Sequence, residues 1–389
     1  MGSYLNPGNK GFRESLNSQI YVDKSGLIEQ TNAVLDTREK YMCVSRPRCF
    51  GKTMALDMLA AYYTCGAHSE ELFENQYIIR KPSFKEHLNQ YNVLKINISD
   101  FLSVAHNIDE MLERFQKYMR ADFEEELEAD CNEHDLGKMM EAVSIKTGRS
   151  FVILIDEWDS VFWRYKKGIA GWKRYLNFLQ TWLNNKNYIA LVYMTGIFPI
   201  KTYRCFSRLN CIFTESSMEN PGTMASFFGF TSAEVEILCR KYGMNFDEAR
   251  AWYDGYRFAD ISVYNPRSVV NAMRFHEYNV YWNQSATYEE LRSYIQLDLP
   301  GLKEAVVRMM EGGTAEIDID KFSDAANVLN EKDEVFTALV HFGYLNYCPE
   351  NRTVSIPNGE VMREYRDIVG INYGKKAKTH SCKIERVEK

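Results

Sequence analysis

The sequence contains the stretch Tyr41-Met-Cys-Val-Ser-Arg-Pro-Arg-Cys-Phe-Gly-Lys-Thr53, which decides the fold. Its first five residues form a short apolar run typical of a buried strand. The run leads into a turn whose Gly51-Lys52-Thr53 opens a helix with apolar periodicity from Met54 to Tyr63. Backbone N–H groups at a helix start, one flexible ammonium group and a hydroxyl that binds Mg²⁺ together suit a polyphosphate. The stretch therefore predicts a binding site for ATP or GTP.

The phosphate loop departs from the usual pattern at its first position. The full motif G-x-x-x-x-G-K-[ST] has glycine where this chain has Arg46. A side chain makes a positive φ angle costly, so we expect the loop to bend differently, with Pro47 fixing one φ angle and Gly51 permitting the sharp entry into the helix. The alternative is a surface turn in which Lys52 is simply solvated. The residues expected to surround the phosphates are Arg46, Pro47, Arg48, Cys49, Phe50, Gly51, Lys52 and Thr53.

Length and composition place the chain among ordinary globular proteins. Its 389 residues exceed what one hydrophobic core usually serves, so two or three subdomains are expected. Hydrophobic residues make up 45% and charged residues 26%, which disfavours the disordered and membrane-embedded classes. A net charge of −6 lacks the basic field of a protein that coats nucleic acid. No apolar run approaches the roughly 20 residues that span a bilayer, so we expect no membrane partner.

Cysteine usage indicates a reducing compartment. The nine cysteines have irregular spacings without a C-x-x-C pair, which excludes a zinc ribbon and a thioredoxin-type motif. We expect reduced, mostly buried thiols and a cytoplasmic location, because disulfides seldom persist in the cytoplasm.

Apolar runs alternate with helical patterns over the first 225 residues. The run 151–155 is apolar at every position, as in a parallel sheet that helices cover on both faces. Such alternation predicts an α/β fold with a P-loop NTPase core, a parallel sheet and right-handed crossovers. The expected strands are 41–45, 93–98, 151–155 and 189–194, and the expected helices include 54–63, 109–128 and 172–183.

Beyond about residue 225 the pattern becomes helical. Thr231 and Glu234 form a capping-box signature, and Asp247 is expected to cap the next helix. Asn265-Pro266 marks a further helix start, with proline in the first turn.

A winged-helix-like unit is expected near the C-terminus. A helical pattern at 333–342 precedes two strand candidates, 344–347 and 353–356, which a Pro-Glu-Asn-Arg turn separates. Such units bind DNA in some proteins and only pack in others, and the net charge favours packing. The expected parts are a P-loop ATPase-like domain 1–225, a helical subdomain 226–330, the winged-helix-like unit 331–368 and a tail 369–389.

Acidic residues follow the third expected strand. Asp156 and Glu157 come directly after the run 151–155. A carboxylate at the carboxyl end of a strand beside the phosphate loop can hold Mg²⁺, so Asp156 and Thr53 are the expected metal ligands. Glu157 is the candidate general base for the attacking water. The alternative is that both acids cap the next helix or are solvated.

Other polar residues are expected at the same edge of the sheet. Thr195 ends the fourth strand and is a candidate catalytic contact to the γ-phosphate or the attacking water, although a hydroxyl before Gly196 is also an ordinary turn cap. Asp159 is expected to form an ion pair at the sheet edge instead of binding metal. Arg46 and Arg48 either neutralise phosphate charge or are solvated. The order of these motifs along the chain predicts a P-loop ATPase core.

Motifs spread over most of the chain occur in the order of a known family. They are Tyr21–Ser25, Ser45–Thr53, Leu154–Asp159, Met194–Gly196, Phe228–Thr231, Tyr253–Phe258 and Tyr264–Ser268. They resemble the predicted AAA-ATPase-like proteins of bacteria, in which the first glycine of the loop is typically missing and arginine is usual where this chain has Cys49. The resemblance implies ATP binding by Lys52 and Thr53, Mg²⁺ at Asp156 and hydrolysis aided by Glu157.

The C-terminal tail bears on a second activity. Longer members of the family carry a PD-(D/E)XK-type nuclease domain after the ATPase, and residues 371–385 look like its closing strands. The body of a nuclease is missing between about 368 and 371. We therefore expect an internally deleted form without nuclease activity, whose tail is loosely packed.

Three functional hypotheses follow. The first is a protein that binds ATP and hydrolyses it with Mg²⁺ to drive a conformational change. The second, motivated by Arg46 and the missing nuclease half, is a nucleotide-gated interaction protein with little turnover. The third is a DNA-binding ATPase that uses the hairpin at 350–352 as a wing. A homo-oligomer and a protein or DNA partner are compatible with each.

Overall fold

The computed structural model divides the chain into two compact units. It describes residues 4–128, 135–165, 168–203, 209–258, 260–282, 288–322 and 329–370. Of these, residues up to 47, those between 51 and 228, and Phe322 form the first unit, and the others form the second. Of the predicted remnant tail 369–389, residues 371–389 lie outside the described residues. The domain boundaries expected from the sequence remain a proposal.

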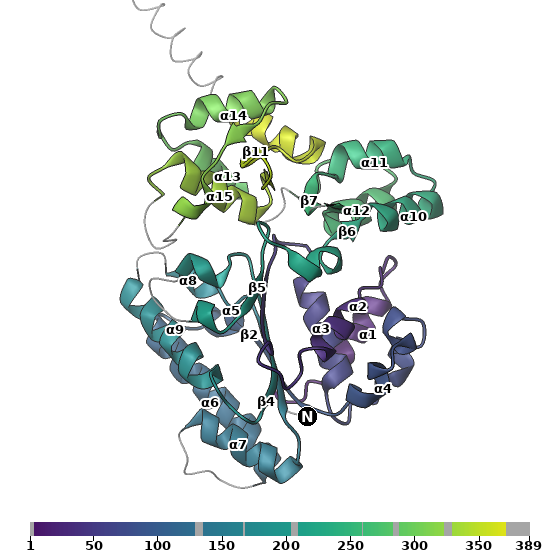
Figure 1. Ribbon diagram of the computed structural model, residues 1–389, viewed down its shortest axis with the longest axis vertical. Coiled ribbons are helices and arrows are strands. Elements are labelled where there is room, and N and C mark those ends of the chain that lie inside the picture. The colour runs from purple at the N-terminus through teal and green to yellow at the C-terminus, as the bar shows by residue number, and fades with distance from the viewer. Residues whose placement is uncertain are drawn as a thin grey trace, which may run out of the picture. The chain divides into compact units, whose positions relative to one another are not determined.

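A five-stranded parallel sheet forms the centre of the first unit (Figure 1). Its order is β2-β3-β4-β1-β5, and every strand pair is parallel. The strands are β1 Tyr41–Ser45, β2 Asn92–Asn97, β3 Phe151–Asp156, β4 Ile189–Gly196 and β5 Thr214–Ser216. All residues of the inner strands β1, β3 and β4 are buried, which explains their apolar sequences. The predicted α/β fold with a parallel sheet is confirmed; β5 was not predicted.

Helices cover both faces of this sheet: α1 to α4 lie on one face and α5 to α9 on the other (Figure 1). In α6, Met111, Phe115, Met119 and Phe123 are buried, which confirms the apolar face expected there. The bounds are α1 Lys10–Leu16, α2 Gly26–Asn32, α3 Lys52–Tyr63, α4 Ser83–His87, α5 Ile98–Ser103, α6 Ile108–Leu127, α7 Leu136–Thr147, α8 Ser160–Arg164 and α9 Ile169–Leu183.

Helices and two small antiparallel sheets make up the second unit. One sheet has the order β6-β8-β7 and the other β10-β11-β9. The strands are β6 Phe230–Thr231, β7 Tyr256–Phe258, β8 Ile261–Tyr264, β9 Ala315–Glu316, β10 Asn346–Cys348 and β11 Thr353–Ser355. The helices are α10 Ser232–Tyr242, α11 Phe246–Tyr253, α12 Pro266–Phe275, α13 Tyr288–Ile295, α14 Leu302–Met310 and α15 Lys332–Phe342, and residues 359–370 are also helical.

The helix caps test the sequence reading locally. The Thr231 and Glu234 capping box is present, and Asn265 caps α12 with Pro266 in its first turn, as predicted. The prediction for Asp247 is wrong, because Asn245 is the N-cap of α11 and its side chain accepts a hydrogen bond of 3.1 Å from the N–H of Glu248. Asn and Asp are nearly equal as N-caps, so the sequence offered two candidates two residues apart.

A helix and a hairpin occur where the winged-helix-like unit was expected, and the unit itself stays a prediction. α15 is followed by the antiparallel hairpin β10–β11, and β9 adds a third strand on β11. The cysteine prediction was partly wrong: among the six described cysteines, all free, only Cys43 and Cys239 are buried. None of the described helices combines the length and the apolar composition that crossing a membrane requires.

A buried carboxyl group on helix 359–370 makes the stability of the second unit depend on pH. Glu364 is 2% exposed, and neither of its carboxylate oxygens has a hydrogen-bond partner within the described chain. Burial, followed by repulsion from Glu360 and Asp367, raises the pKa of Glu364 from 4.5 to about 8. The folded state therefore holds a proton that the unfolded chain releases above pH 4.5, so stability falls as pH rises toward 8.

We expect Glu364→Gln to remove this dependence. At pH 9 the variant should be more stable than the unchanged protein by on the order of 3 kcal/mol, and at pH 4 the two should be equal. Denaturant unfolding at both pH values measures the difference, with the exposed Glu304→Gln as control. Equal stabilisation by Glu364→Gln at both pH values would contradict the burial of the Glu364 carboxyl without a hydrogen-bond partner.

Candidate nucleotide-binding site

The phosphate loop lies between β1 and α3. The left-handed backbone occurs at Cys49 (φ 67°) and Gly51 (φ 87°), and Arg46 is not among the residues with positive φ. A glycine at position 46 is therefore unnecessary, which explains how the loop forms without it. Gly51 is the N-cap of α3, and its carbonyl accepts the first helical hydrogen bond, 2.9 Å from the N–H of Ala55. The first turn of α3 thus presents its N–H groups at the loop.

Lys52 closes the loop on itself. Its ammonium group donates hydrogen bonds of 2.9 Å to the carbonyl oxygen of Arg46 and 2.8 Å to that of Pro47. The residue is 9% exposed, so it is not the solvated lysine of a surface turn. The ammonium group can turn toward an anion in the same loop. It then loses two hydrogen bonds to neutral carbonyl oxygens and gains stronger ones to charged oxygens.

Arg46 is directed into the core. It is fully buried and donates hydrogen bonds of 2.8 Å to the Ser45 carbonyl oxygen and 2.8 Å to Ser216 Oγ on β5. Its guanidinium carbon lies 5.6 Å from the Phe228 ring centroid. Burial lowers the pKa of Arg46 to about 10, which still leaves it charged at neutral pH. This position does not favour the predicted role of the Arg46 side chain in neutralising phosphate charge.

Residues 48–50 of the loop belong to the second unit. The Phe50 ring packs edge-on against the Tyr256 ring, with centroids 5.3 Å apart. The backbone carbonyl oxygen of Phe50 accepts a hydrogen bond of 3.2 Å from the N–H of Gly229. Arg267 on α12 places Nη1 3.7 Å from Cys49 Sγ. This contact could not be predicted from the sequence, because Arg267 and Cys49 are more than 200 positions apart.

The carboxyl ends of the central strands bring three distant polar groups together. Asp156 is 2% exposed; its Oδ2 accepts a hydrogen bond of 2.7 Å from Thr53 Oγ1, and its Oδ1 accepts one of 2.5 Å from Thr195 Oγ1. The strand register explains why Asp156 and Thr195 come together. Ile155 pairs with Met194 and the two strands are parallel, so the residues that follow them lie side by side. The structure thus places Thr53, Asp156 and Thr195 in direct contact.

Glu157 adopts a left-handed backbone (φ 51°), which is uncommon for a residue other than glycine. Its Oε2 accepts a hydrogen bond from the hydroxyl of Ser99 in α5. α5 follows β2 directly, and the register pairs Asn97 with Asp156. Ser99 was missed by the sequence reading, although a hydroxyl two residues beyond a strand that neighbours β3 is a signal that could have identified it.

A third acid faces the same place. Burial, then repulsion from Glu157 and Asp156, raises the pKa of Asp100. Asp100 therefore lies within electrostatic range of both acids, but no three His, Cys, Asp or Glu side chains of the described residues are grouped as metal ligands.

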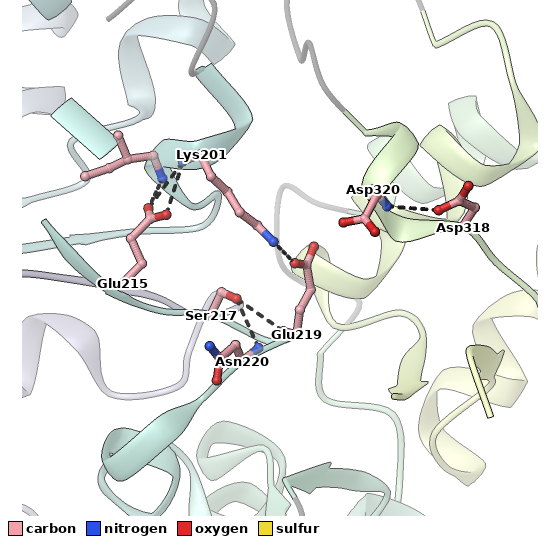
Figure 2. Close-up of polar contacts among 8 residues, drawn as sticks. Lys201, Glu215, Ser217, Glu219, Asn220, Asp318 and Asp320 are labelled. Carbon is pink, nitrogen blue, oxygen red and sulfur yellow. Dashed lines mark hydrogen bonds and ion pairs between the residues drawn. The ribbon is translucent and has the colours of Figure 1, made fainter. Parts of the chain in front are cut away.

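Two carboxylates, the buried Asp159 and the half-buried Glu215, anchor the chain beyond Thr195. Asp159 Oδ2 accepts hydrogen bonds from the N–H groups of Ile197 (2.9 Å) and Phe198 (2.8 Å). This differs from the ion pair that we expected for Asp159. Figure 2 shows the second anchor: Glu215 accepts from the N–H of Lys201, whose ammonium group pairs with Glu219.

A comparison with family models now bears on this site. A model described as "Predicted AAA-ATPase" matches residues 10–206, which include the loop, both acids and Thr195. The chain belongs to the predicted AAA-ATPase family. The resemblance found in the sequence is confirmed, and the α/β core with its phosphate loop is that of a P-loop protein.

Individual relatives of this predicted AAA-ATPase are distant. An uncharacterized protein in the vnfD 5′ region of Azotobacter chroococcum mcd 1 is 23% identical over 279 residues, which are 69% of this chain and 51% of that protein. The chain therefore spans about half the length of this curated relative. The Aeropyrum pernix ORC2 protein, solved in ADPNP–ADP complexes, has a TM-score of 0.43 at 10% identity and covers 95% of this chain and 99% of its own. Cdc6p from Pyrobaculum aerophilum has a TM-score of 0.32 at 10% identity, with 94% and 98% covered.

A separate cleft lies within the second unit. Its volume is about 860 Å³, and α11, β7 and the β10–β11 hairpin line it. The charged residues of its lining are Asp247, Asp254, Glu350, Arg250 and Arg257. With three carboxylates against two guanidinium groups, this surface beside the hairpin does not favour a polyanion such as DNA.

Proposed function

We propose that this member of the predicted AAA-ATPase family binds ATP with Mg²⁺ and hydrolyses it. The observation that carries the proposal is the contact of 2.7 Å between Thr53 Oγ1, at the head of α3, and Asp156 Oδ2, at the end of β3. A hydroxyl beside a strand-end carboxylate, next to a lysine and open helical N–H groups, is the arrangement that magnesium triphosphate requires.

Each residue of the site has a proposed task. Lys52 leaves the carbonyls of Arg46 and Pro47 and donates to the β- and γ-phosphate oxygens, while the first turn of α3 supplies N–H donors. Thr53 and Asp156 hold Mg²⁺, which neutralises phosphate charge when bound. The residues fit this ion because their donors are all oxygen.

The remaining residues act on the attacking water and the γ-phosphate. Glu157 would accept a proton from the water as general base, and Thr195, whose Oγ1 lies 2.5 Å from Asp156 Oδ1, would donate its hydroxyl hydrogen toward the phosphate. Phosphate release from ATP, with and without Mg²⁺, tests the proposal.

One observation favours a second function, a nucleotide-gated switch with little turnover. Both reactive groups are occupied within the chain: Lys52 by two loop carbonyls and Glu157 by Ser99. A carboxylate that already accepts a hydrogen bond from Ser99 is a weaker base toward water. Turnover in this state is therefore slow.

We expect Ser99→Ala to raise the turnover number about tenfold without changing the affinity for ATP. A hydrogen bond to a carboxylate contributes about 1.5–3 kcal/mol. Lowering the activation free energy of hydrolysis by roughly half of that amount raises the rate by about this factor. Steady-state phosphate release measures it. Ser103→Ala is the matched control, because Ser103 lies on the same helix and bonds only the Asp100 carbonyl among the described contacts. A fall in turnover would mean that Ser99 positions Glu157 for catalysis.

The other proposals concern the whole chain. We propose a helical part at 226–330, a winged-helix-like unit at 331–368, a cytoplasmic location, and no nuclease activity. A homo-oligomer, and a protein or DNA partner, are likewise proposals.

A further inference from the structure

Asp159 is a buried carboxylate without a task in the mechanism above. It is 2% exposed, and its Oδ2 accepts from the N–H groups of Ile197 and Phe198 and, at 3.5 Å, from Trp163 Nε1. The packing around it is tight: a Cβ atom on Gly196 would lie 2.8 Å from Asp159 Oδ1. Asp159 therefore fixes the two residues that follow the Thr195-Gly196 strand end.

The charge of Asp159 is linked to the phosphate loop. Burial raises the pKa of this carboxyl, and the influences that oppose the rise are the two N–H donors, the charge of Lys52 and the Trp163 hydrogen bond. Lys52 is the one cation among them. The group that we propose as a phosphate ligand thus also supports the ionised form of Asp159.

Phe198 carries this link to a distant part of the sequence. Its ring lies 4.8 Å from the Trp163 ring and stacks on Phe322 with centroids 5.8 Å apart at 23°. Phe322 belongs to the first unit, whereas the residues before it, up to Lys321, belong to the second. A shift of the Phe198 backbone therefore acts on the point where the chain passes between the two units.

We propose that Asp159 is a positioning residue that transmits the nucleotide state of the loop to the Phe198–Phe322 stack. The proposal rests on the proposed function. When the Lys52 ammonium group turns to phosphate, Asp159 loses part of its compensating charge and gains an anion nearby. The strength of its hydrogen bonds from the Ile197 and Phe198 N–H groups then changes. The Phe198–Phe322 stack therefore has two states of different energy, one without nucleotide and one with it.

Two variants separate the charge of Asp159 from its shape. Asp159→Asn keeps an oxygen that accepts from the Ile197 and Phe198 N–H groups but removes the charge, whereas Asp159→Ala removes both. Hydrogen exchange of peptides containing 197–201 and Phe322 is followed with and without Mg²⁺ and a non-hydrolysable ATP analogue. The unchanged protein should show nucleotide-dependent exchange in both peptides.

In Asp159→Asn we expect the analogue to bind within about threefold of the normal affinity, the nucleotide effect on both peptides to disappear, and the turnover number to fall at least tenfold with little change in KM. Retention of the exchange response and of normal turnover in Asp159→Asn, with defects only in Asp159→Ala, would show a structural role and overturn the proposal. So would loss of binding together with unfolding in Asp159→Asn. If the unchanged protein binds no nucleotide, the proposed function fails instead.

Discussion

Replacing Lys52 with alanine is expected to remove ATP binding and hydrolysis together. The ammonium group lies at the head of α3, where it donates hydrogen bonds to two carbonyl oxygens of the loop. Phosphoryl transfer depends on positioned charge, so its loss should lower kcat/KM by at least about a hundredfold. Calorimetric titration with Mg²⁺ and a non-hydrolysable analogue, followed by steady-state phosphate release, measures both effects.

The matched control is Lys10→Ala, since Lys10 is an exposed lysine of the same unit with a long ion pair of 3.9 Å to Glu14. It should bind and turn over normally. Because Lys52 is itself buried, circular dichroism must show that Lys52→Ala is folded. A folded Lys52→Ala protein with unchanged affinity would place the nucleotide elsewhere.

Replacing Glu157 with glutamine is expected to separate binding from turnover. The amide keeps the shape and can still contact Ser99, but it cannot take a proton from water. A general base contributes about 10²–10⁴ in rate, so turnover should fall by at least a hundredfold while affinity stays within about threefold. Single-turnover phosphate release and equilibrium binding of labelled ATP give the two quantities.

Glu113→Gln, at an exposed position of α6, controls for the loss of one negative charge. It should leave both quantities unchanged. Turnover of Glu157→Gln near that of the unchanged protein would transfer the role of base to another group, and Asp100 would be the next candidate because repulsion from Glu157 and Asp156 contributes to its raised pKa.

The central sheet was predictable because each of its inner strands is an apolar run that can be recognised without knowledge of its neighbours. β1, β3 and β4 are buried throughout, so each is an unbroken apolar run, and motif order then places Lys52, Asp156 and Thr195 at one edge. β5 escaped prediction because Thr214-Glu-Ser216 is short and polar, with its first residue exposed. Its contribution, the Ser216 hydroxyl that accepts from Arg46, was invisible for the same reason.

The sequence reading missed partners that tertiary structure brings together. Ser99 meets Glu157 because β2 and β3 are neighbours, and Arg267 meets Cys49 across more than 200 residues. The backbone at Cys49 is a further case. Its positive φ replaces the one that a glycine at position 46 would supply, and a cysteine carries no sequence signal for that conformation.

A crystal structure with Mg²⁺ and a non-hydrolysable ATP analogue tests the proposed site most directly. We predict the Lys52 ammonium group about 3 Å from β- and γ-phosphate oxygens, no longer on the loop carbonyls, and Mg²⁺ about 2.1 Å from Thr53 Oγ1 with Asp156 bound to it directly or through one water. A nucleotide bound away from the head of α3, or Lys52 still held by the carbonyls of Arg46 and Pro47 beside bound phosphates, would contradict the proposed mechanism.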